Sequence, residues 1–171
     1  KHYDDAAGEF EWASDLRPDW PAPWYWLGRA ELAIGESRAI ALENIREVLG
    51  LDALSKAARA FARAAAVDPS YSRALVDLAT TALRQRITPR LDVAQRALRL
   101  AAATAAGREP AVLLARGRVE LELDARDSAL DAFRGYVAAG GDSGIGGLEI
   151  ARTLALLERP DSAVRQYFAT V

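Results

Sequence analysis

The chain has 171 residues, of which 51% are hydrophobic and 27% are charged, and its formal net charge is −2. This composition is ordinary for a folded protein, and the length suits one domain or one short run of stacked repeats. A net charge of this size excludes the broad positive field that attracts proteins to nucleic acid, and the absence of cysteine excludes disulfides, thiolate zinc sites and cysteine catalysis.

Two further absences bear on the context of the chain. No run of about 18 apolar residues occurs, so the sequence predicts no transmembrane helix. The sequence also contains no methionine. Lys1 is therefore not an initiator residue, and we expect a signal peptide, a larger domain or further residues upstream of it.

The first part of the chain predicts four helices. Alanine, leucine, arginine and glutamate dominate and β-branched residues are few, which favours helix over strand. The predicted helices cover residues 3–16, 21–34, 37–48 and 53–67. Pro18 ends the first of them, Gly35 is the expected C-cap of the second, and Gly50 stops the third.

The remainder predicts six more helices in three pairs. Their expected ranges are 72–86 with 91–105, 111–123 with 126–139, and 148–157 with 161–170. A turn at Thr88-Pro89 separates the members of the first pair. The glycine-rich run from Gly140 to Gly147 predicts a loop before the last pair.

One pattern of small and aromatic residues recurs along these helices. Its best copies have identical internal spacing: Ala6, Phe10, Ala13 and Pro18, then Ala57, Phe61, Ala64 and Pro69. The two copies are 51 residues apart, which is one period of 34 residues plus 17 that match the segment around 37–51. Ala129 and Phe133 recur 34 residues later as Ala163 and Tyr167.

With this spacing the sequence resembles the tetratricopeptide repeat family over essentially its whole length. The best-matched residues are Trp24, Leu27, Gly28, Ala57, Phe61, Ala64, Pro69, Gly117, Ala129 and Phe133. A glycine or alanine lets two antiparallel helices approach closely, and the aromatic ring fills the space between neighbouring pairs. The departures are the insertion after Gly35, a longer turn near Pro89, and Arg116 where the family usually places an apolar residue; they predict irregular curvature within the same fold.

The resemblance implies an all-α fold, a right-handed α-solenoid of about four antiparallel helix pairs with a 17-residue helical insertion. We expect a single domain over 1–171. Its parts are a first rear helix with the next front helix (3–34), the insertion (35–52) and the following repeats (53–109, 110–143 and 144–171).

In this family the front helix of each pair lines a concave surface that commonly holds a peptide or partner segment. The resemblance implies that this surface comprises Tyr25, Trp26, Arg29, Arg73, Asp77, Arg84, Arg118, Glu122, Glu149 and Arg152. Arg29, Arg118 and Arg152 stand at equivalent places in three repeats, so they could bind carboxylates along an extended partner. The alternative is that they are solvated charges paired with Glu122 or Glu149.

Aromatic residues are concentrated near the start of the chain. Trp12, Trp20, Trp24, Tyr25 and Trp26 fall within fifteen residues. Tryptophan and tyrosine are enriched at binding hot spots and at membrane interfaces. We expect Trp24 and Trp20 to pack in the core, and Tyr25 and Trp26 to lie on the surface because they point away from the Trp24 side.

The ends of a repeat stack need polar caps. The chain opens on a rear helix and stops at Val171 without a capping helix, so Phe10 and Tyr167 are expected to be partly uncovered. Either residues beyond the ends or a partner would cover these faces.

Catalytic features are scarce. His2 is the only histidine and lies near the end of the chain, which leaves no site for histidine-based acid–base catalysis. No serine lies in a nucleophile elbow, and no strand precedes the Gly140–Gly147 run as a phosphate loop requires. Asp4 and Asp5 are first-turn acids that the helix dipole favours. We expect no metal site, no cofactor and no enzymatic activity.

The sequence therefore predicts a protein–protein interaction module, a scaffold or accessory subunit that docks to a larger complex through its concave face and uncapped ends. One form of this prediction is peripheral contact of the module with a membrane-associated complex. A weaker resemblance, to the repeat regions of exported bacterial proteins with a GWxTD domain, favours a periplasmic or exported location, although that motif is absent. The alternatives are a regulatory or substrate-presenting domain of a longer, exported enzyme, and a cofactor or lipid carrier, which would need an apolar pocket.

Overall fold

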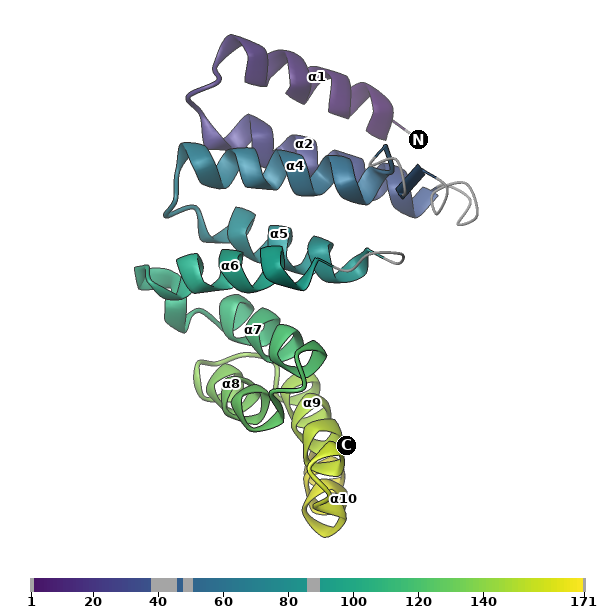
Figure 1. Ribbon diagram of the computed structural model, residues 1–171, viewed down its shortest axis with the longest axis vertical. Helices are drawn as coiled ribbons and strands as arrows, with labels where there is room; N and C mark the ends of the chain where they lie inside the picture. Colours follow the sequence, from purple (N-terminus) through teal and green to yellow (C-terminus); the bar gives the residue numbers. More distant parts are fainter. Residues whose placement is uncertain (1, 38–45, 48–50, 86–89, 171) are drawn as a thin grey trace. The chain divides into compact units, whose positions relative to one another are not determined.

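The computed structural model describes residues 2–37, 46–47, 51–85 and 90–170. The long helices are α1 (Tyr3–Leu16), α2 (Pro21–Ser37), α4 (Ala53–Val67), α5 (Ser72–Arg84), α6 (Leu91–Ala102), α7 (Pro110–Glu122), α8 (Arg126–Ala138), α9 (Ser143–Leu156) and α10 (Pro160–Thr170) (Figure 1). A short 3₁₀ helix, η1, covers Ala105–Arg108. In the described ranges the fold is all-α, as predicted.

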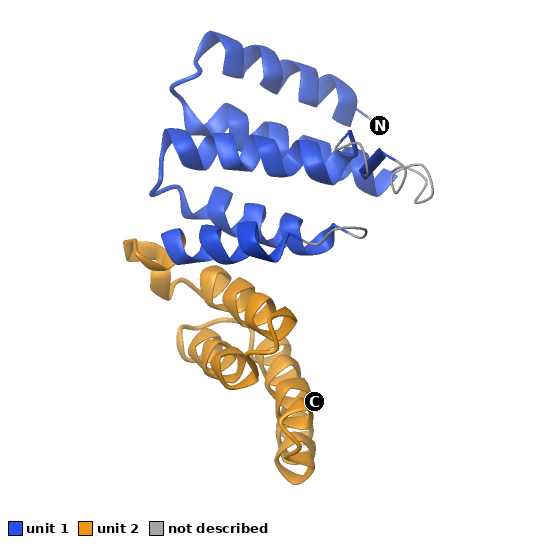
Figure 2. Ribbon diagram, viewed as in Figure 1, with its two compact units in different colours: residues 1–100 blue, residues 101–171 orange. Residues whose placement is uncertain are grey.

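The chain divides into two compact units, residues 1–100 and 101–171 (Figure 2). In the first unit α2 packs between α1 and α4, and α4 also packs against α5. In the second unit α8 packs between α7 and α9, and α9 packs against α10. The helices thus form consecutive antiparallel pairs, which confirms the predicted class of fold. The prediction of a single domain stays a prediction.

Two close approaches of glycine to phenylalanine hold equivalent pairs together. A Cβ atom at Gly28 of α2 would lie 2.5 Å from the ring of Phe61 on α4, and one at Gly117 of α7 would lie 2.4 Å from the ring of Phe133 on α8. Both rings are fully buried. The first pair of residues is 33 apart in sequence and the second is 16 apart. The difference equals the predicted 17-residue insertion.

Local sequence explains where several helices begin. Asp52 caps α4 by accepting a hydrogen bond from the Ser55 backbone N–H at 2.7 Å, and such a cap contributes about 1 kcal/mol. Proline occupies the first position of α2, α7 and α10, where its missing N–H has no helical partner to lose.

Three of the predicted boundaries are wrong. Helix α2 continues through Gly35 to Ser37, because that glycine is a contact residue and not a cap: its Cβ would lie 2.7 Å from the Cβ of Ala53. Helix α6 ends at Ala102, three residues early, and η1 follows. Most of the predicted helix 37–48 and the turn at Thr88-Pro89 lie outside the described residues.

The third correction concerns the predicted loop from Gly140 to Gly147, most of which is the first part of α9. Asp142 caps this helix, since its side chain accepts a hydrogen bond from the Ile145 N–H at 2.8 Å. A Cβ at Gly146 would lie 2.3 Å from Cγ2 of Val137 on α8. Glycine here permits close packing of two helices, where the sequence analysis predicted a loop.

Gly8 in α1 offers a simple test of helix stability. No atom lies within 4 Å of a Cβ built there, so Gly8→Ala adds no clash and removes backbone entropy from the unfolded chain. We expect the free energy of unfolding to rise by about 0.5–1 kcal/mol. Urea denaturation followed by circular dichroism measures it, and a destabilised variant would contradict the open environment.

Candidate functional site

Two ion pairs join the front helices α2 and α5 of the first unit. Nη1 of Arg29 lies 3.4 Å from Oδ2 of Asp77, and Nη2 of Arg84 lies 3.1 Å from Oε1 of Glu36. Each pair is 48 residues apart in sequence. Arg29, Asp77 and Arg84 were predicted as site residues, whereas Glu36 was missed. Its spacing could have identified it. Glu36 and Arg84 lie seven residues after Arg29 and Asp77, so they are the same 48 residues apart, with the acid and the base exchanged.

Tyr25 is not on the surface, contrary to prediction: only 5% of it is exposed. Its ring centroid lies 5.7 Å from that of Phe61 and 5.5 Å from that of Tyr71. The position next to the family tryptophan therefore fills space between α2, α4 and the start of α5. The hydroxyl nevertheless reaches the charged face, where it accepts a hydrogen bond from Arg29 at 3.5 Å.

Burial, and after it the negative charge of Asp77, raises the pKa of Tyr25 above its usual value near 10. The folded protein therefore holds this proton to higher pH than the unfolded chain does. The resulting stability is fully present below the unfolded-state pKa of about 10 and is lost as pH rises through the folded-state pKa.

We expect Tyr25→Phe to remove this part of the alkaline loss of stability. The measurement is the free energy of unfolding from urea titrations at about pH 9 and about pH 11, on either side of the ordinary tyrosine pKa. An alkaline decline as steep in the variant as in the wild type would show that other groups cause it.

The tryptophans near the start of the chain are distributed differently from the prediction. Trp20 is 53% exposed and lies under the guanidinium of Arg17, 4.4 Å from the ring centroid, so its predicted place in the core is wrong. Trp24 is half-buried and donates its indole N–H to the carbonyl of Pro18 at 3.3 Å. Trp26 is 48% exposed, as predicted, and stacks on Phe10 with centroids 6.4 Å apart.

In the second unit Glu149 of α9 connects two of the predicted arginines. Its Oε1 lies 2.9 Å from Nε of Arg118 on α7, and its Oε2 lies 4.0 Å from Nη1 of Arg152. The glutamate side chain is 14% exposed, against 46% for Arg118 and 67% for Arg152. The alternative of paired charges is therefore correct here with Glu149 as partner. Both arginine side chains nevertheless stay partly exposed to solvent.

The remaining predicted residues, Arg73 on α5 and Glu122 at the end of α7, are exposed. Within the described part of the chain, no cluster of three or more His, Cys, Asp or Glu side chains could hold a metal ion. His2 is exposed and lies 3.3 Å from a carboxylate oxygen of Asp5. Among the helices that the structure describes, none is both long enough and apolar enough to span a bilayer.

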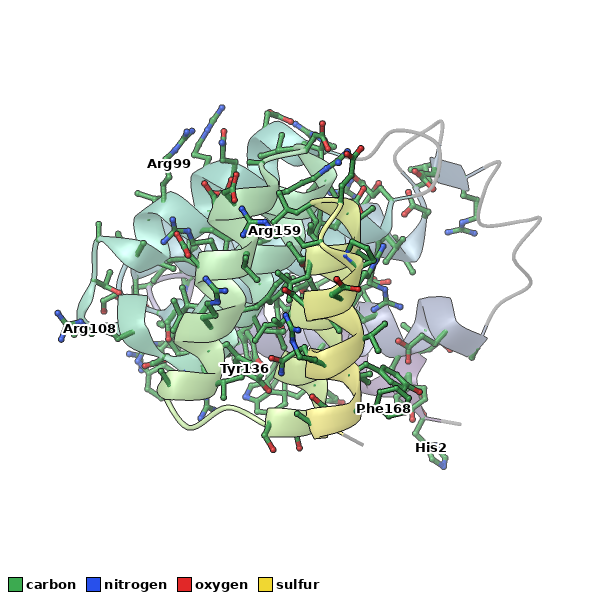
Figure 3. The ribbon with its side chains drawn as sticks, turned by 90° about the horizontal axis from the view of Figure 1, so that it is seen from below. His2, Arg99, Arg108, Tyr136, Arg159 and Phe168 are labelled. Carbon is green, nitrogen blue, oxygen red and sulfur yellow. The ribbon has the colours of Figure 1, made fainter. Side chains whose placement is uncertain are left out.

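Apolar side chains are exposed at the α9–α10 end of the second unit. The exposed members are Ile145, Leu148, Val164, Tyr167 and Phe168. Phe168 is 74% exposed, and its side chain on α10 is labelled in Figure 3. A shallow hollow of about 420 Å³ lies between α9 and α10 on this face. Tyr167 is 47% exposed, in agreement with the expectation that it is partly uncovered.

Consecutive antiparallel helix pairs, closed by a small residue against an aromatic ring, define a fold of the tetratricopeptide repeat type. Solved structures of this type match nearly the whole chain. The thermophilic TPR protein TTC0263 of Thermus thermophilus is 24% identical, with a TM-score of 0.69, over 98% of this chain and 81% of that one.

Structures of MamA are similar to this chain as well. The structure titled "MamA 41-end from Desulfovibrio magneticus RS-1" has a TM-score of 0.77 at 12% identity, over 98% of this chain and 83% of that one. A second MamA structure has a TM-score of 0.76 at 16% identity, over 98% and 80%. No protein-family model and no curated protein sequence matches the chain. At these identities the likeness establishes the fold alone.

Proposed function

We propose that this chain is a non-enzymatic scaffold or accessory subunit that binds a segment of a partner protein on its front helices. The observation that carries the proposal is the charge arrangement around Glu149. One largely buried carboxylate pairs with Arg118 and lies 4.0 Å from Arg152, while the two arginine side chains stay 46% and 67% exposed. Guanidinium groups held in this way lose little further entropy on binding and have donors left for a partner's carboxylates.

One ion pair of the first unit, between Arg29 and Asp77, supports the same proposal, whereas in the Arg84–Glu36 pair the acid is the more exposed member. Arg29 is 52% exposed and its partner Asp77 is 22% exposed, so again the acid is the more buried member. Trp26 adds an exposed aromatic side chain on the same helix as Arg29. Tryptophan and arginine are the residue types that contribute most at protein interfaces.

The apolar end formed by α9 and α10 is proposed as a second contact with the larger complex. Exposed apolar patches on soluble domains mark interaction sites, and Phe168 together with Val164 supplies its most exposed side chains. Arg152 also lines the hollow between α9 and α10, so the charged site and this apolar end adjoin each other.

Cross-linking mass spectrometry in native membrane and soluble extracts tests the proposal. We expect reproducible links between the chain and one large complex. In the double variant Arg118→Glu, Arg152→Glu these links should fall about tenfold or more, because each substitution places a negative charge against a carboxylate of the partner. Arg159→Glu is the matched control, since Arg159 is exposed at the start of α10 (Figure 3). Self-links only, from a protein that runs as a free species, would contradict an accessory subunit.

A further inference from the structure

The outer face of α1 presents two large apolar side chains to solvent. Gly8, Trp12 and Leu16 follow one another at intervals of four residues, which places them on one side of the helix; we call them the α1 face. Trp12 is 63% exposed and Leu16 is 59% exposed. Ala7 and Ser14, which are buried, lie on the other side. The apolar side chains of the α1 face are therefore available for contact with another molecule.

Gly8 lacks the packing partner that another helical glycine has. A Cβ at Gly28 would lie 2.5 Å from the ring of Phe61, whereas within the described structure nothing lies within 4 Å of a Cβ at Gly8. Ala57 and Phe61 show how a small residue and an aromatic residue four positions apart pack between helices, since both are fully buried. Gly8 and Trp12 repeat that spacing on an exposed face. Such a pair suits the close approach of a further helix.

The second unit offers an apolar hollow of about 420 Å³ between α9 and α10. The two alanines that line it, Ala151 and Ala163, are buried, whereas Leu148, Val164 and Phe168 are exposed around them. Small buried residues surrounded by larger exposed ones leave room for one bulky side chain. Interfaces place their central aromatic residues in pockets of this kind.

The most exposed large apolar side chains of the described residues belong to these two surfaces. Phe168 is 74% exposed, and Trp12, Leu16 and Val164 follow with 63%, 59% and 54%. Two of the four are on α1 and two are on α10. Exposed apolar patches mark interaction sites. The two patches also differ in form, because α1 projects a large ring and the α9–α10 end is hollowed.

The two surfaces carry opposite charges. Helix α1 contains five acidic residues and no lysine or arginine. Glu9 and Asp15 are exposed, three positions before and after Trp12, so each lies about one turn from that ring. Among the described residues that line the hollow, Arg152 alone is charged. An acid of α1 therefore faces this arginine whichever way the helix lies in the hollow.

Arg152 has donors left for an acid from another molecule. Its Nη1 lies 4.0 Å from Oε2 of Glu149, beyond hydrogen-bond distance, while Glu149 approaches Arg118 to 2.9 Å. The Arg152 side chain is 67% exposed, and a guanidinium group has five N–H donors. A second carboxylate can therefore pair with Arg152 while the contact between Glu149 and Arg118 stays in place.

We propose that the α1 face of one copy of this chain packs into the α9–α10 hollow of a second copy, so that copies join head to tail. The ring of Trp12 enters the hollow beside Phe168, and Glu9 or Asp15 pairs with Arg152 at its rim. Because the contact joins two different surfaces, each copy keeps one of them free, and association continues beyond a dimer or closes as a ring. The inference rests on the proposed function in one respect, that the α9–α10 end is a contact surface, and it names the occupant of that surface.

Sedimentation velocity of the 171-residue chain over a range of concentrations tests the proposal. We expect the sedimentation coefficient to rise past that of a dimer as the concentration increases. Trp12→Asp and Phe168→Asp should each weaken association about thirtyfold or more, as the loss of a central aromatic residue does at an interface. Trp20→Asp and Leu100→Asp are matched controls: these side chains are 53% and 50% exposed but belong to neither surface, so association should be unchanged.

A mixture of the two defective variants gives the sharpest result. Trp12→Asp keeps an intact hollow and Phe168→Asp keeps an intact α1 face, so an equimolar mixture should form a one-to-one dimer that grows no further. Formation of that dimer also shows that both variants fold. A mixture that stays monomeric, or a single variant that associates as well as the wild type, would overturn the proposal.

Exchange of the charges supplies an independent readout. Arg152→Glu should weaken association about tenfold in low salt, because it places two acids opposite each other. Addition of Glu9→Lys and Asp15→Lys to the same chain should recover most of this loss, and the recovery should disappear at about 1 M salt, where charges are screened within about 3 Å. A triple variant as weak as Arg152→Glu in low salt would count against the proposed contact.

The purified chain is measured without the larger complex, so the two proposals fail separately. A chain that stays monomeric up to about 1 mM, yet still cross-links to one complex in extracts, would overturn head-to-tail joining alone. Self-association of the purified chain, with no links to a complex in extracts, would support head-to-tail joining and contradict the accessory subunit.

Discussion

Phe133→Ala is expected to lower the free energy of unfolding of the second unit by about 3–5 kcal/mol, the usual cost of deleting a buried phenylalanine ring. The ring is fully buried. It packs in one cluster with Leu130, Ile150 and Leu154 and faces Gly117 of α7, so its loss leaves a cavity among α7, α8 and α9. Urea denaturation of the whole chain measures the change. Phe168→Ala is the control: that ring is 74% exposed, and its removal should change stability by less than about 0.5 kcal/mol.

The same ring accounts for the glycine that faces it. Gly117→Ala alone places a Cβ 2.4 Å from Phe133 and should cost about 1–3 kcal/mol through overpacking. Combined with Phe133→Leu, the alanine has room, so the double variant should be more stable than the sum of the single effects predicts. Strict additivity would mean that the two residues are not in contact.

The helices were predictable because small and aromatic residues that recur at helical spacing are compatible with few other folds. The sets around Phe10 and Phe61 have identical spacing, and this repetition predicted the pairing of the helices. The structure confirms paired helices through the glycine contacts of Gly28 and Gly117. The length of the insertion followed from the same comparison. Local spacing is informative when one contact requires both a residue without a side chain and a ring of fixed size.

The errors arose where neighbouring side chains, which the sequence does not place, decide the outcome. Tyr25 was expected on the surface from its direction relative to Trp24, but its ring packs against Tyr71, the residue that precedes α5. Trp20 was expected in the core from its residue type, yet it is 53% exposed and only the guanidinium of Arg17 is recorded over its ring. Amphipathic aromatic side chains occupy both environments, so residue type alone cannot separate them.

The candidate site was only partly accessible to sequence reasoning for a similar reason. Arg118 and Arg152 were identified from their repeat positions, and Glu149 from its helix, but their mutual pairing depends on the approach of α7 to α9. A groove of about 560 Å³ lined by residues of α4, α5 and α6 was not located from the sequence, because it forms where three helices leave space between small side chains. A run of alanines in a helix is equally compatible with a tightly packed neighbour.

Gly146→Val is expected to lower the free energy of unfolding by about 1–3 kcal/mol, the usual cost of overpacking. A Cβ at this position would lie 2.3 Å from Cγ2 of Val137 and 3.0 Å from the ring of Tyr136, both on α8. Valine is stiff about its first side-chain bond, and the tyrosine is held by the backbone N–H of Asp142, which donates to its hydroxyl at 2.9 Å. Neither neighbour can move away easily.

Two variants determine whether packing or backbone conformation requires this glycine. Gly8→Val makes the same substitution in a helix where a Cβ meets no atom within 4 Å, and it should change stability by no more than about 0.5 kcal/mol. Val137→Ala in the Gly146→Val background should recover part of the loss, because it removes the closest contact. Suppose that this rescue fails and that Gly8→Val also loses much stability. Backbone flexibility would then matter more than the space between α8 and α9. The glycine-rich run would then act as the loop that the sequence predicted.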